Sequence, residues 1–249
     1  MKPGEHDIMR AVEDHYWWYR ALRGHVANSI KPGSPKFSLL DAGCGTGGML
    51  ATLREKFPEA KLAGIDASED GVRHTVERSL EAQVLNASVH ELPFPSSSFD
   101  FVLSLDVWSH ANVDDGLAAH ETHRVLRPDG QLILNLAAFE FLKGAHDYAV
   151  EVDRRYTRPQ VRTLLEGGGF QIERLTYWNA MMMPPIALVR WLSRMHAARA
   201  PNDASSDFRP LPAFVNMMLK RVAALELSAS RHLSLPFGTS VFAIARKHG

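Results

Sequence analysis

Short apolar runs of four to seven residues, bounded by Gly, Pro or Asp, recur along the chain with helical patterns between them. They predict strands at residues 37–42, 61–66, 82–86, 99–105, 131–137, 170–176 and 239–246. Helices are predicted near residues 49–56, 68–80, 114–125 and 157–167. This alternation is typical of an α/β doubly wound sheet, whose ligand lies beyond the carboxyl ends of the strands.

A region before the first strand departs from this alternation. Residues 5–30 have the pattern of a helix, and one side of its wheel carries Ile8, Val12, Tyr16, Tyr19, Leu22 and Val26. Trp17 projects to the opposite side, so a second surface or a ligand must cover it. We expect residues 1–32 to form a helical lid over a core domain of residues 33–178.

A second region, residues 179–236, separates the last two strands and is predicted to be a helical insertion. It carries helical patterns at 185–198 and 212–231, joined by "RAPNDASSDFRP", which reads as a mobile loop. The insertion is rich in methionine, which adapts to irregular apolar ligands. Packing onto the sheet is the ordinary use of such helices, and they could instead form a homodimer face. Residues 237–249 return to the core sheet as its final strand.

Composition narrows the function classes. Lys and Arg total 28, as do Asp and Glu, so no overall field favours nucleic acid. The single cysteine cannot form an internal disulfide, and the start of the chain lacks the pattern of a secretory signal, which together favour a cytoplasmic protein. No apolar run approaches the roughly 18 residues of a membrane-spanning helix, so stable membrane insertion is not expected. No Cys and His spacing indicates a metal site.

The stretch "FSLLDAGCGTGGML", residues 37–50, holds the strongest chemical signal. Gly43, Gly45 and Gly48 have the G-x-G-x-x-G spacing between a predicted strand and a predicted helix, as in nucleotide-binding loops. Asp41 ends the strand near the position of a dinucleotide's pyrophosphate, where two like charges about 4 Å apart would repel by roughly 4 kcal/mol. A cationic ligand suits this carboxylate better.

Asp66 follows the loop by 18 residues, which is the spacing of an acid that accepts ribose hydroxyls. A ligand with a ribose and cationic groups, and without a phosphate, fits both acids. The alternative is that Asp41 and Asp66 only cap the helices that follow them.

Several segments together resemble the class I S-adenosylmethionine-dependent methyltransferases, in particular the methyltransferase type 11 group. They are "LLDAGCGTGG" (39–48), "GID" (64–66), "ASVHELPFPSSSFDFVLS" (87–104), "HRVLRPDGQLIL" (123–134) and "SVFAIARK" (240–247). The resemblance implies a Rossmann-like seven-stranded sheet with the last strand antiparallel, and S-adenosylmethionine as cofactor. It implies cofactor contacts from Asp41, Gly43, Cys44, Gly45, Asp66, Ala67, Asn86, Ala87 and Leu105. The family usually has an acid where this chain has Asn86, although an amide oxygen can still accept a hydrogen bond from adenine.

His110 is the predicted proton acceptor, because many relatives carry histidine at this position and the unperturbed pKa is about 6.5. Its other interpretation is a histidine that shapes the loop at a helix end. Asp106 is a weaker candidate of the same kind. The predicted acceptor-binding residues are Tyr16, Trp17, Tyr19, Trp108, His146, Asp147, Arg155 and Tyr156. The segment that holds the last four resembles a subset of the family that acts on small or lipid-linked acceptors.

The sequence therefore predicts an enzyme that transfers a methyl group to a small, partly hydrophobic organic molecule, with oxygen slightly favoured over nitrogen or carbon as the acceptor atom. One alternative is a module that binds S-adenosylmethionine without catalysis, and another is a nicotinamide-dependent oxidoreductase. A nucleic-acid base is disfavoured as the acceptor, because DNA amino-methyltransferases place Asn or Asp, Pro, Pro and an aromatic residue after the fourth strand, where this chain reads "LDVW".

Overall fold

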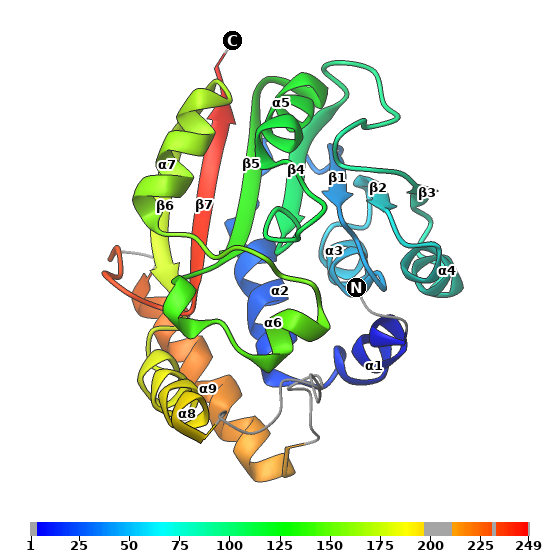
Figure 1. The fold of residues 1–249 in the computed structure, drawn as a ribbon. Helices are drawn as coiled ribbons and strands as arrows, with labels where there is room; N and C mark the ends of the chain where they lie inside the picture. Colours follow the sequence, from blue (N-terminus) through cyan, green and yellow to red (C-terminus); the bar gives the residue numbers. More distant parts are fainter. Residues whose placement is uncertain (1–3, 197–210, 231–232, 249) are drawn as a thin grey trace.

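The protein, described from a computed structural model over residues 4–196, 211–230 and 233–248, is built on one seven-stranded sheet (Figure 1). The strands lie in the order β3-β2-β1-β4-β5-β7-β6. They span β1 Ser38–Ala42, β2 Lys61–Asp66, β3 Gln83–Asn86, β4 Phe99–Leu105, β5 Leu126–Ala137, β6 Phe170–Trp178 and β7 Ser240–Lys247. Strand β7 pairs antiparallel with both β5 and β6, whereas β1 to β5 pair in parallel. The predicted fold is confirmed.

The helices that join these strands are α3 Gly48–Lys56, α4 Glu69–Glu77, α5 Asp115–Val125 and α7 Arg158–Gly167. The side chain of Ser68 accepts a hydrogen bond from the backbone N–H of Gly71, which is the N-cap contact expected at the start of α4. Between β5 and α7 the chain forms a short 3-10 helix, η1 Glu140–Leu142, and α6 Ala145–Ala149. These two turns lie beyond the carboxyl end of β5.

Successive side chains of the buried strands point to opposite faces of the sheet, and the core therefore has two layers, one on each face. Leu40 and Val102 belong to the layer that contains residues of α5 and α7. Their neighbours Leu39 and Leu103 point the other way and pack with residues of α2 and α3. Because successive side chains of a strand alternate between faces, both layers require an apolar strand, which is why these runs are continuous.

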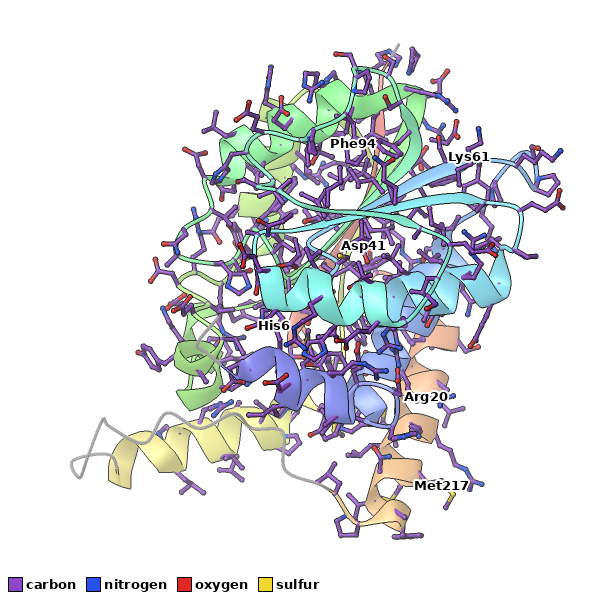
Figure 2. The ribbon with its side chains drawn as sticks, turned by 90° about the vertical axis from the view of Figure 1, so that its right-hand side faces the viewer. His6, Arg20, Asp41, Lys61, Phe94 and Met217 are labelled. Carbon is purple, nitrogen blue, oxygen red and sulfur yellow. The ribbon has the colours of Figure 1, made fainter. Side chains whose placement is uncertain are left out.

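The N-terminal region folds as two helices rather than the continuous helix expected over residues 5–30: α1 Glu5–Val12 and α2 Trp17–Ser29. Trp17 is buried, in keeping with the expectation that a second surface must cover it, and its backbone N–H donates to Oδ1 of Asn216. Figure 2 shows α1 beside α4, with His6 between the two helices. The break lets α1 turn over the glycine loop while α2 packs beneath the sheet.

The insertion before the last strand consists of α8 Met183–His196 and α9 Ala213–Ser230. Helix α9 packs on α2, and the buried carboxylate of Glu226 accepts hydrogen bonds from the backbone N–H groups of Ala180 and Met181. The predicted loop at residues 199–210, and the predicted helix ends beyond 196 and at 231, lie outside the described residues. Within the part of the chain that is described, no helix combines the length and apolarity needed to cross a membrane.

Candidate functional site

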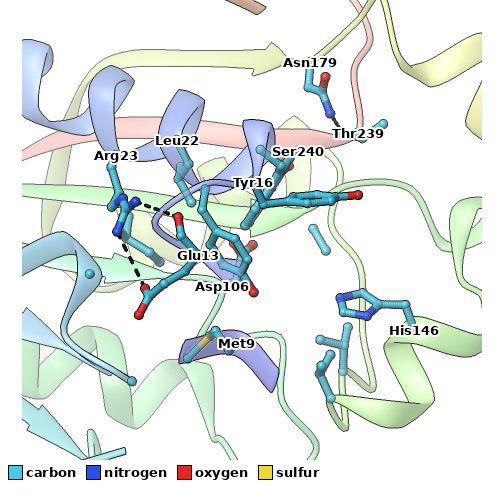
Figure 3. Close-up of a pocket in the computed structure, with 18 of the residues that line it drawn as sticks. Met9, Glu13, Tyr16, Leu22, Arg23, Asp106, His146, Asn179, Thr239 and Ser240 are labelled. Atoms are coloured by element: carbon cyan, nitrogen blue, oxygen red, sulfur yellow. Dashed lines mark hydrogen bonds and ion pairs between the residues drawn. The ribbon is translucent and has the colours of Figure 1, made fainter. Parts of the chain in front are cut away.

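A cavity of about 350 Å³ opens at the carboxyl ends of β1, β4 and β5, between α2, α6 and α8 (Figure 3). Thirteen residues predicted for the site line it: Tyr16, Trp17, Tyr19, Asp41, Gly43, Cys44, Gly45, Leu105, Asp106, His110, His146, Asp147 and Arg155. Apolar side chains from Leu142, Val150, Val152 and Ile186 complete one end. Residues far apart in the sequence thus converge on one cavity.

The glycine loop forms the floor of this cavity. Gly43 and Gly45 have φ angles of 100° and 53°, in the left-handed region that favours glycine. The backbone N–H groups of Gly43 and Cys44 both donate to the carbonyl oxygen of Ile65, at 2.9 and 2.8 Å, which ties the loop to β2. A Cβ added at Gly43 would overlap Cγ2 of Val107, so the loop also packs tightly against the residues that follow β4.

Asp41 contributes a buried carboxyl group to the cavity. The side chain is only 1% exposed, and the described part of the chain offers no hydrogen-bond partner to Oδ1. Burial, and secondarily the nearby charge of Asp66, raise the pKa of Asp41 to about 7. An unsatisfied buried acceptor of this kind is satisfied by a ligand that brings a cationic donor, and the residues present therefore fit the ammonium group of the expected cofactor.

Asp66 lies at the end of β2, next to the glycine loop. Oδ2 accepts from the backbone N–H of Gly45 at 2.8 Å, and Oδ1 accepts from that of Ser68, also at 2.8 Å. Since each carboxylate oxygen can accept a further hydrogen bond, these contacts leave capacity for ribose hydroxyls. Four predicted cofactor contacts lie outside the lining of the cavity: Asp66, Ala67, Asn86 and Ala87.

The structure adds a buried ionic cluster that the sequence analysis missed. The carboxylate of Glu13, in the break between α1 and α2, accepts hydrogen bonds from Thr46 of the glycine loop and from Arg78, the latter at 2.5 Å. Arg23 lies 3.7 Å from the same carboxylate. The cluster fastens the N-terminal lid to the loop. Glu13 and Arg23 stand in the lid segment that the sequence singled out, but no local pattern pairs them with Arg78.

At the end of β4 two titratable side chains line the cavity. Burial lowers the pKa of His110 below its usual 6.5, so the ring is neutral at pH 7. Burial raises the pKa of Asp106 to about 7, against the opposing effect of a hydrogen bond from Asn135. Both groups can accept a proton near neutral pH.

Arg155 and Asp147 form an ion pair at the rim of the cavity. Nε and Nη2 of Arg155 lie 2.9 and 2.8 Å from Oδ1 of Asp147, and Nη1 donates to the carbonyl oxygen of Ala138. Each nitrogen of the guanidinium group therefore already has a hydrogen-bond or ion-pair partner within the protein. Arg155 lines the cavity as part of this ion pair, and its contact with the acceptor stays a prediction.

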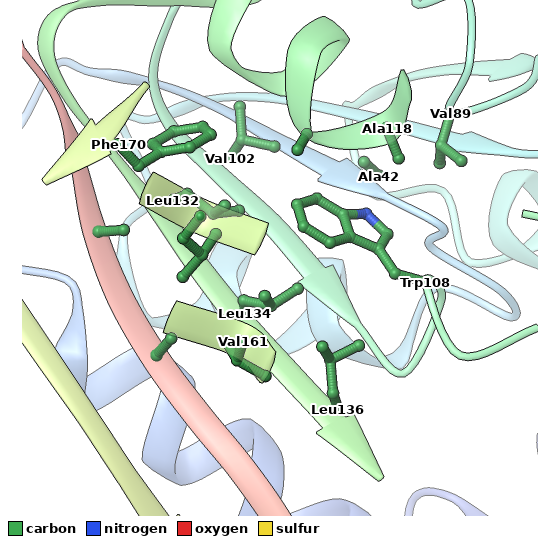
Figure 4. Close-up of a cluster of buried hydrophobic side chains, with 14 of the residues drawn as sticks. Ala42, Val89, Val102, Trp108, Ala118, Leu132, Leu134, Leu136, Val161 and Phe170 are labelled. Atoms are coloured by element: carbon green, nitrogen blue, oxygen red, sulfur yellow. The ribbon is translucent and has the colours of Figure 1, made fainter. Parts of the chain in front are cut away.

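The structure places two predicted acceptor contacts away from the cavity. Trp108 is 0% exposed in the core layer that also contains Ala42, Val89 and Ala118 (Figure 4). Tyr156 is buried too, and its hydroxyl oxygen lies 3.1 Å from the carbonyl oxygen of Trp108 and 2.7 Å from Oδ2 of Asp115. Both residues lie close in the sequence to residues that line the cavity, which is why they were predicted for the site. The turn after β4, however, directs Trp108 into the core.

Trp108→Ala should lower the free energy of unfolding by about 3–5 kcal/mol, because the change leaves a large cavity in a packed layer. At a temperature where the variant is folded, binding of S-adenosylhomocysteine should change by less than about twofold, since the side chain lies outside the cavity. Urea unfolding and calorimetry measure the two quantities. Leu117→Ala, at a leucine that is 53% exposed on α5, is the control and should leave stability almost unchanged. Weakened ligand binding with unchanged stability would contradict a core role for Trp108.

Comparison with known proteins agrees with this geometry. A protein-family model described as a methyltransferase domain matches residues 40–134, which include the glycine loop, Asp66 and His110. An uncharacterized 37.1 kDa protein in transposon TN4556 of Streptomyces fradiae is 33% identical over 159 residues, which cover 61% of this chain and 45% of that protein. A malonyl-[acyl-carrier protein] O-methyltransferase of Herminiimonas arsenicoxydans is 30% identical over 185 residues, covering 69% of this chain and 70% of the relative.

The fold is shared with geranyl diphosphate C-methyltransferase from Streptomyces coelicolor A3(2), solved with Mg2+, geranyl diphosphate and S-adenosyl-L-homocysteine. The TM-score is 0.61 at 14% sequence identity, with 92% of this chain and 80% of that chain covered. The chain spans less than half of the Streptomyces fradiae relative and about 70% of the Herminiimonas enzyme. The glycine loop with its two acids, the sheet order and these matches lead to one assignment: the chain belongs to the class I S-adenosylmethionine-dependent methyltransferases, in the type 11 group, and its cofactor is S-adenosylmethionine.

Proposed function

We propose that this chain transfers the methyl group of S-adenosylmethionine to a small, partly hydrophobic organic molecule, with oxygen slightly favoured as the acceptor atom. One observation carries the proposal: the glycine loop and Asp41 line the same cavity as the apolar side chains of Leu142, Val150, Val152 and Ile186. The Herminiimonas relative is named for methyl transfer to oxygen, which supports the choice of atom.

Each cofactor contact proposed here has a physical role. The cofactor, when bound, supplies a methyl group on a positively charged sulfur. Asp41 would accept hydrogen bonds from its ammonium group, and Asp66 would accept those of the ribose hydroxyls. The main chain can approach the methionine portion closely at Gly43 and Gly45, on either side of Cys44, because glycine has no Cβ to block the contact. Leu105 would cover the ligand, while Ala67, Asn86 and Ala87 would flank adenine.

The acceptor half is proposed to lie between the lid and the segment after β5. Tyr16, Trp17 and Tyr19 reach the cavity from the start of α2, and Figure 3 shows His146 on the side opposite Glu13 and Arg23. Walls of this kind hold both reactants at contact distance, which supplies much of the rate of a displacement, and they exclude water. His110 and Asp106 are the candidates for the group that takes the acceptor's proton. A homodimer, formed through exposed side chains of α8 and α9 such as Trp191 and Phe214, is a further proposal.

The test is transfer of labelled methyl groups from the cofactor to a small-molecule extract, together with Asp66→Asn. We expect the variant to weaken binding of S-adenosylhomocysteine by about 10–100-fold, since each hydrogen bond to a charged group contributes about 1.5–3 kcal/mol. Transfer should fall accordingly at limiting cofactor. Asp70→Asn, at an exposed carboxylate on α4 that pairs with Arg73, is the control and should change neither quantity.

Three results separate the alternatives. Binding of S-adenosylhomocysteine with no label in any small-molecule fraction would favour a module that binds without catalysis. Binding of NADH together with indifference to S-adenosylhomocysteine would favour an oxidoreductase. Equal transfer by the wild type and Asp66→Asn at limiting cofactor would remove Asp66 from the cofactor site.

A further inference from the structure

Asp106 is held in an unusual backbone conformation at the edge of the cavity. Its φ angle is 62°, in the left-handed region that few residues other than glycine, asparagine and aspartate adopt. The backbone N–H donates to the carbonyl oxygen of Asn135 at 2.8 Å, which fixes the turn against β5. This conformation directs the carboxyl group toward the cavity while the next two residues, Val107 and Trp108, turn into packed layers.

Asn135 also holds the side chain of Asp106. Its Nδ2 donates to Oδ1 and Oδ2 of the carboxylate at 3.0 and 2.9 Å. Its Oδ1 accepts from Nε1 of Trp178 at 2.7 Å. Because an indole nitrogen only donates, Trp178 forces the oxygen of the amide toward itself and the nitrogen toward Asp106. Asn135 and Trp178 are both fully buried, so the three residues form a directional, preorganised network.

Few charges oppose ionisation of this carboxyl group. Burial is the main cause that raises its pKa to about 7, while Asn135 and Arg155 lower the pKa and Asp147 raises it. On α2, the pKa of Tyr19 is raised well above its usual value by burial and secondarily by Glu13 and Asp106, so the phenol stays neutral. The other titratable or charged side chains that line the cavity are Glu13, Tyr16, Arg23, Asp41, Cys44, His110, His146 and Arg190. A carboxyl group that is half ionised near neutral pH is suited to accept a proton in catalysis.

We propose that Asp106 is the proton acceptor of the transfer reaction, so that the acceptor molecule carries a neutral hydroxyl or amino group and not a carboxylate. This inference rests on the proposed function. The lone pair of the acceptor oxygen or nitrogen forms the bond to the methyl carbon, and the electron pair of the broken sulfur–carbon bond stays on sulfur. The acceptor's proton passes to a carboxylate oxygen of Asp106 and then to water. Charge balances, because one sulfonium and one carboxylate become neutral.

A carboxylate acceptor would meet a different environment. It has no proton to give up, and it would have to approach an ionised Asp106 in a closed site. Two such charges about 4 Å apart repel by roughly 4 kcal/mol at an effective dielectric constant of 20. Arg155 offers only part of the compensation, since it is already paired with Asp147. In this respect the proposed acceptor differs from that of the Herminiimonas relative, which is named a malonyl-[acyl-carrier protein] O-methyltransferase.

The first test reads the ionisation of Asp106 without requiring turnover. Infrared difference spectra of the S-adenosylhomocysteine complex between pH 5 and pH 9 should show a protonated carboxyl band that disappears as the pH rises through about 7. Asp41 titrates in the same range in the free protein, but the ammonium group of the ligand lowers its pKa and removes its contribution. The band should be absent in Asp106→Asn and present in His110→Gln. A band retained in Asp106→Asn would overturn the proposal.

The second test uses three matched acceptors, 4-propylphenol, 4-propylaniline and 4-propylbenzoate, with labelled cofactor at saturation. We expect label in the phenol or the aniline and none in the benzoate. The kcat of the wild type should rise with pH and level off above about 7, because Asp106 must be deprotonated. Asp106→Asn should lower kcat by about 10²–10⁴-fold and abolish this pH limb, with binding of S-adenosylhomocysteine unchanged. His110→Gln should keep the limb.

Two results would overturn the inference while leaving the proposed function intact. One is transfer to 4-propylbenzoate alone, with equal rates in Asp106→Asn. The other is loss of the pH limb in His110→Gln but not in Asp106→Asn, with a wild-type midpoint below 6.5, which would make His110 the proton acceptor. Failure to bind S-adenosylhomocysteine at all would instead count against the proposed function.

Discussion

Asp41→Asn should weaken the binding of S-adenosylhomocysteine on the order of 100-fold, since a hydrogen bond to a charged group contributes up to about 3 kcal/mol and 1.4 kcal/mol is tenfold. The amide keeps the size of the side chain but loses its negative charge. Asp41 is buried at the end of β1, and its Oδ1 has no partner within the described residues, so the ligand's ammonium group supplies the missing donor. Isothermal titration calorimetry at pH 8 measures the change.

The pH dependence gives this prediction a second readout. The pKa of Asp41 is raised to about 7, so below pH 7 the free protein carries a proton there that a cationic ligand must displace. The wild-type affinity should therefore fall by up to tenfold per pH unit below about 7, and the affinity of Asp41→Asn should be nearly flat. A variant whose pH profile parallels that of the wild type would exclude Asp41 from the ammonium site.

Stability should move in the opposite direction from binding. The folded protein keeps the proton on Asp41 up to about pH 7, whereas the unfolded chain loses it near the ordinary aspartate pKa of 3.8. Because the folded state binds more protons in this window, the free energy of unfolding falls as the pH rises from about 4 to 7. Asp41→Asn removes this loss and should be more stable than the wild type at pH 8, which shows that weak binding does not come from unfolding.

Asp100 provides a control of opposite sign. Despite the opposing effect of burial, hydrogen bonds from Ser38 and Arg127 hold the pKa of Asp100 below its usual value. The stability that Asp100 contributes is fully present above its pKa in the unfolded chain. It is lost as the pH falls through the lower pKa of Asp100 in the folded protein. Asp100→Asn should thus destabilise the protein at pH 7 and leave ligand binding unchanged, since Asp100 lies outside the cavity.

Local sequence signals determined most of the sheet and the cofactor half of the site. The run that ends at Ala42 must be a buried strand, and the glycines after it allow the positive φ angles that the loop adopts. Asp41 and Asp66 then fall at the ends of adjacent parallel strands, as the paired register of β1 and β2 requires. Each of these features depends on residues close together in the chain.

The acceptor half depends on contacts between distant residues, and here sequence reasoning was weaker. The hydrogen bonds that hold Asp106 come from Asn135, whose amide is oriented by Trp178, 43 positions further on. Trp108 lies two residues after Asp106 but enters the core, because the residue at φ 62° reverses the path of the chain. The break at Glu13 likewise follows from its contacts with Thr46 and Arg78, which no helical periodicity encodes.

Gly43→Ala should lower the free energy of unfolding by about 2–5 kcal/mol. Placing a Cβ in the left-handed region costs about 1–2 kcal/mol, and overpacking a filled space costs about 1–3 kcal/mol more. At Gly43 the φ angle is 100°, and the new methyl group would overlap Cγ2 of Val107, a β-branched side chain with little freedom to move. Urea unfolding measures the loss, and calorimetry should show weaker binding of S-adenosylhomocysteine because the loop must shift.

Gly24→Ala is the matched control, because Gly24 lies within α2 and an added Cβ there would have no heavy atom within 4 Å. This change should stabilise the protein by about 0.5–1 kcal/mol through helix propensity. A double-mutant cycle with Val107→Ala separates the two costs at Gly43: removing the branched side chain should relieve the overlap but leave the backbone strain. The coupling energy between Gly43→Ala and Val107→Ala should therefore be stabilising. Its magnitude should be smaller than the stability lost in Gly43→Ala alone. A Gly43→Ala variant as stable as the wild type would contradict the loop conformation on which the cofactor site depends.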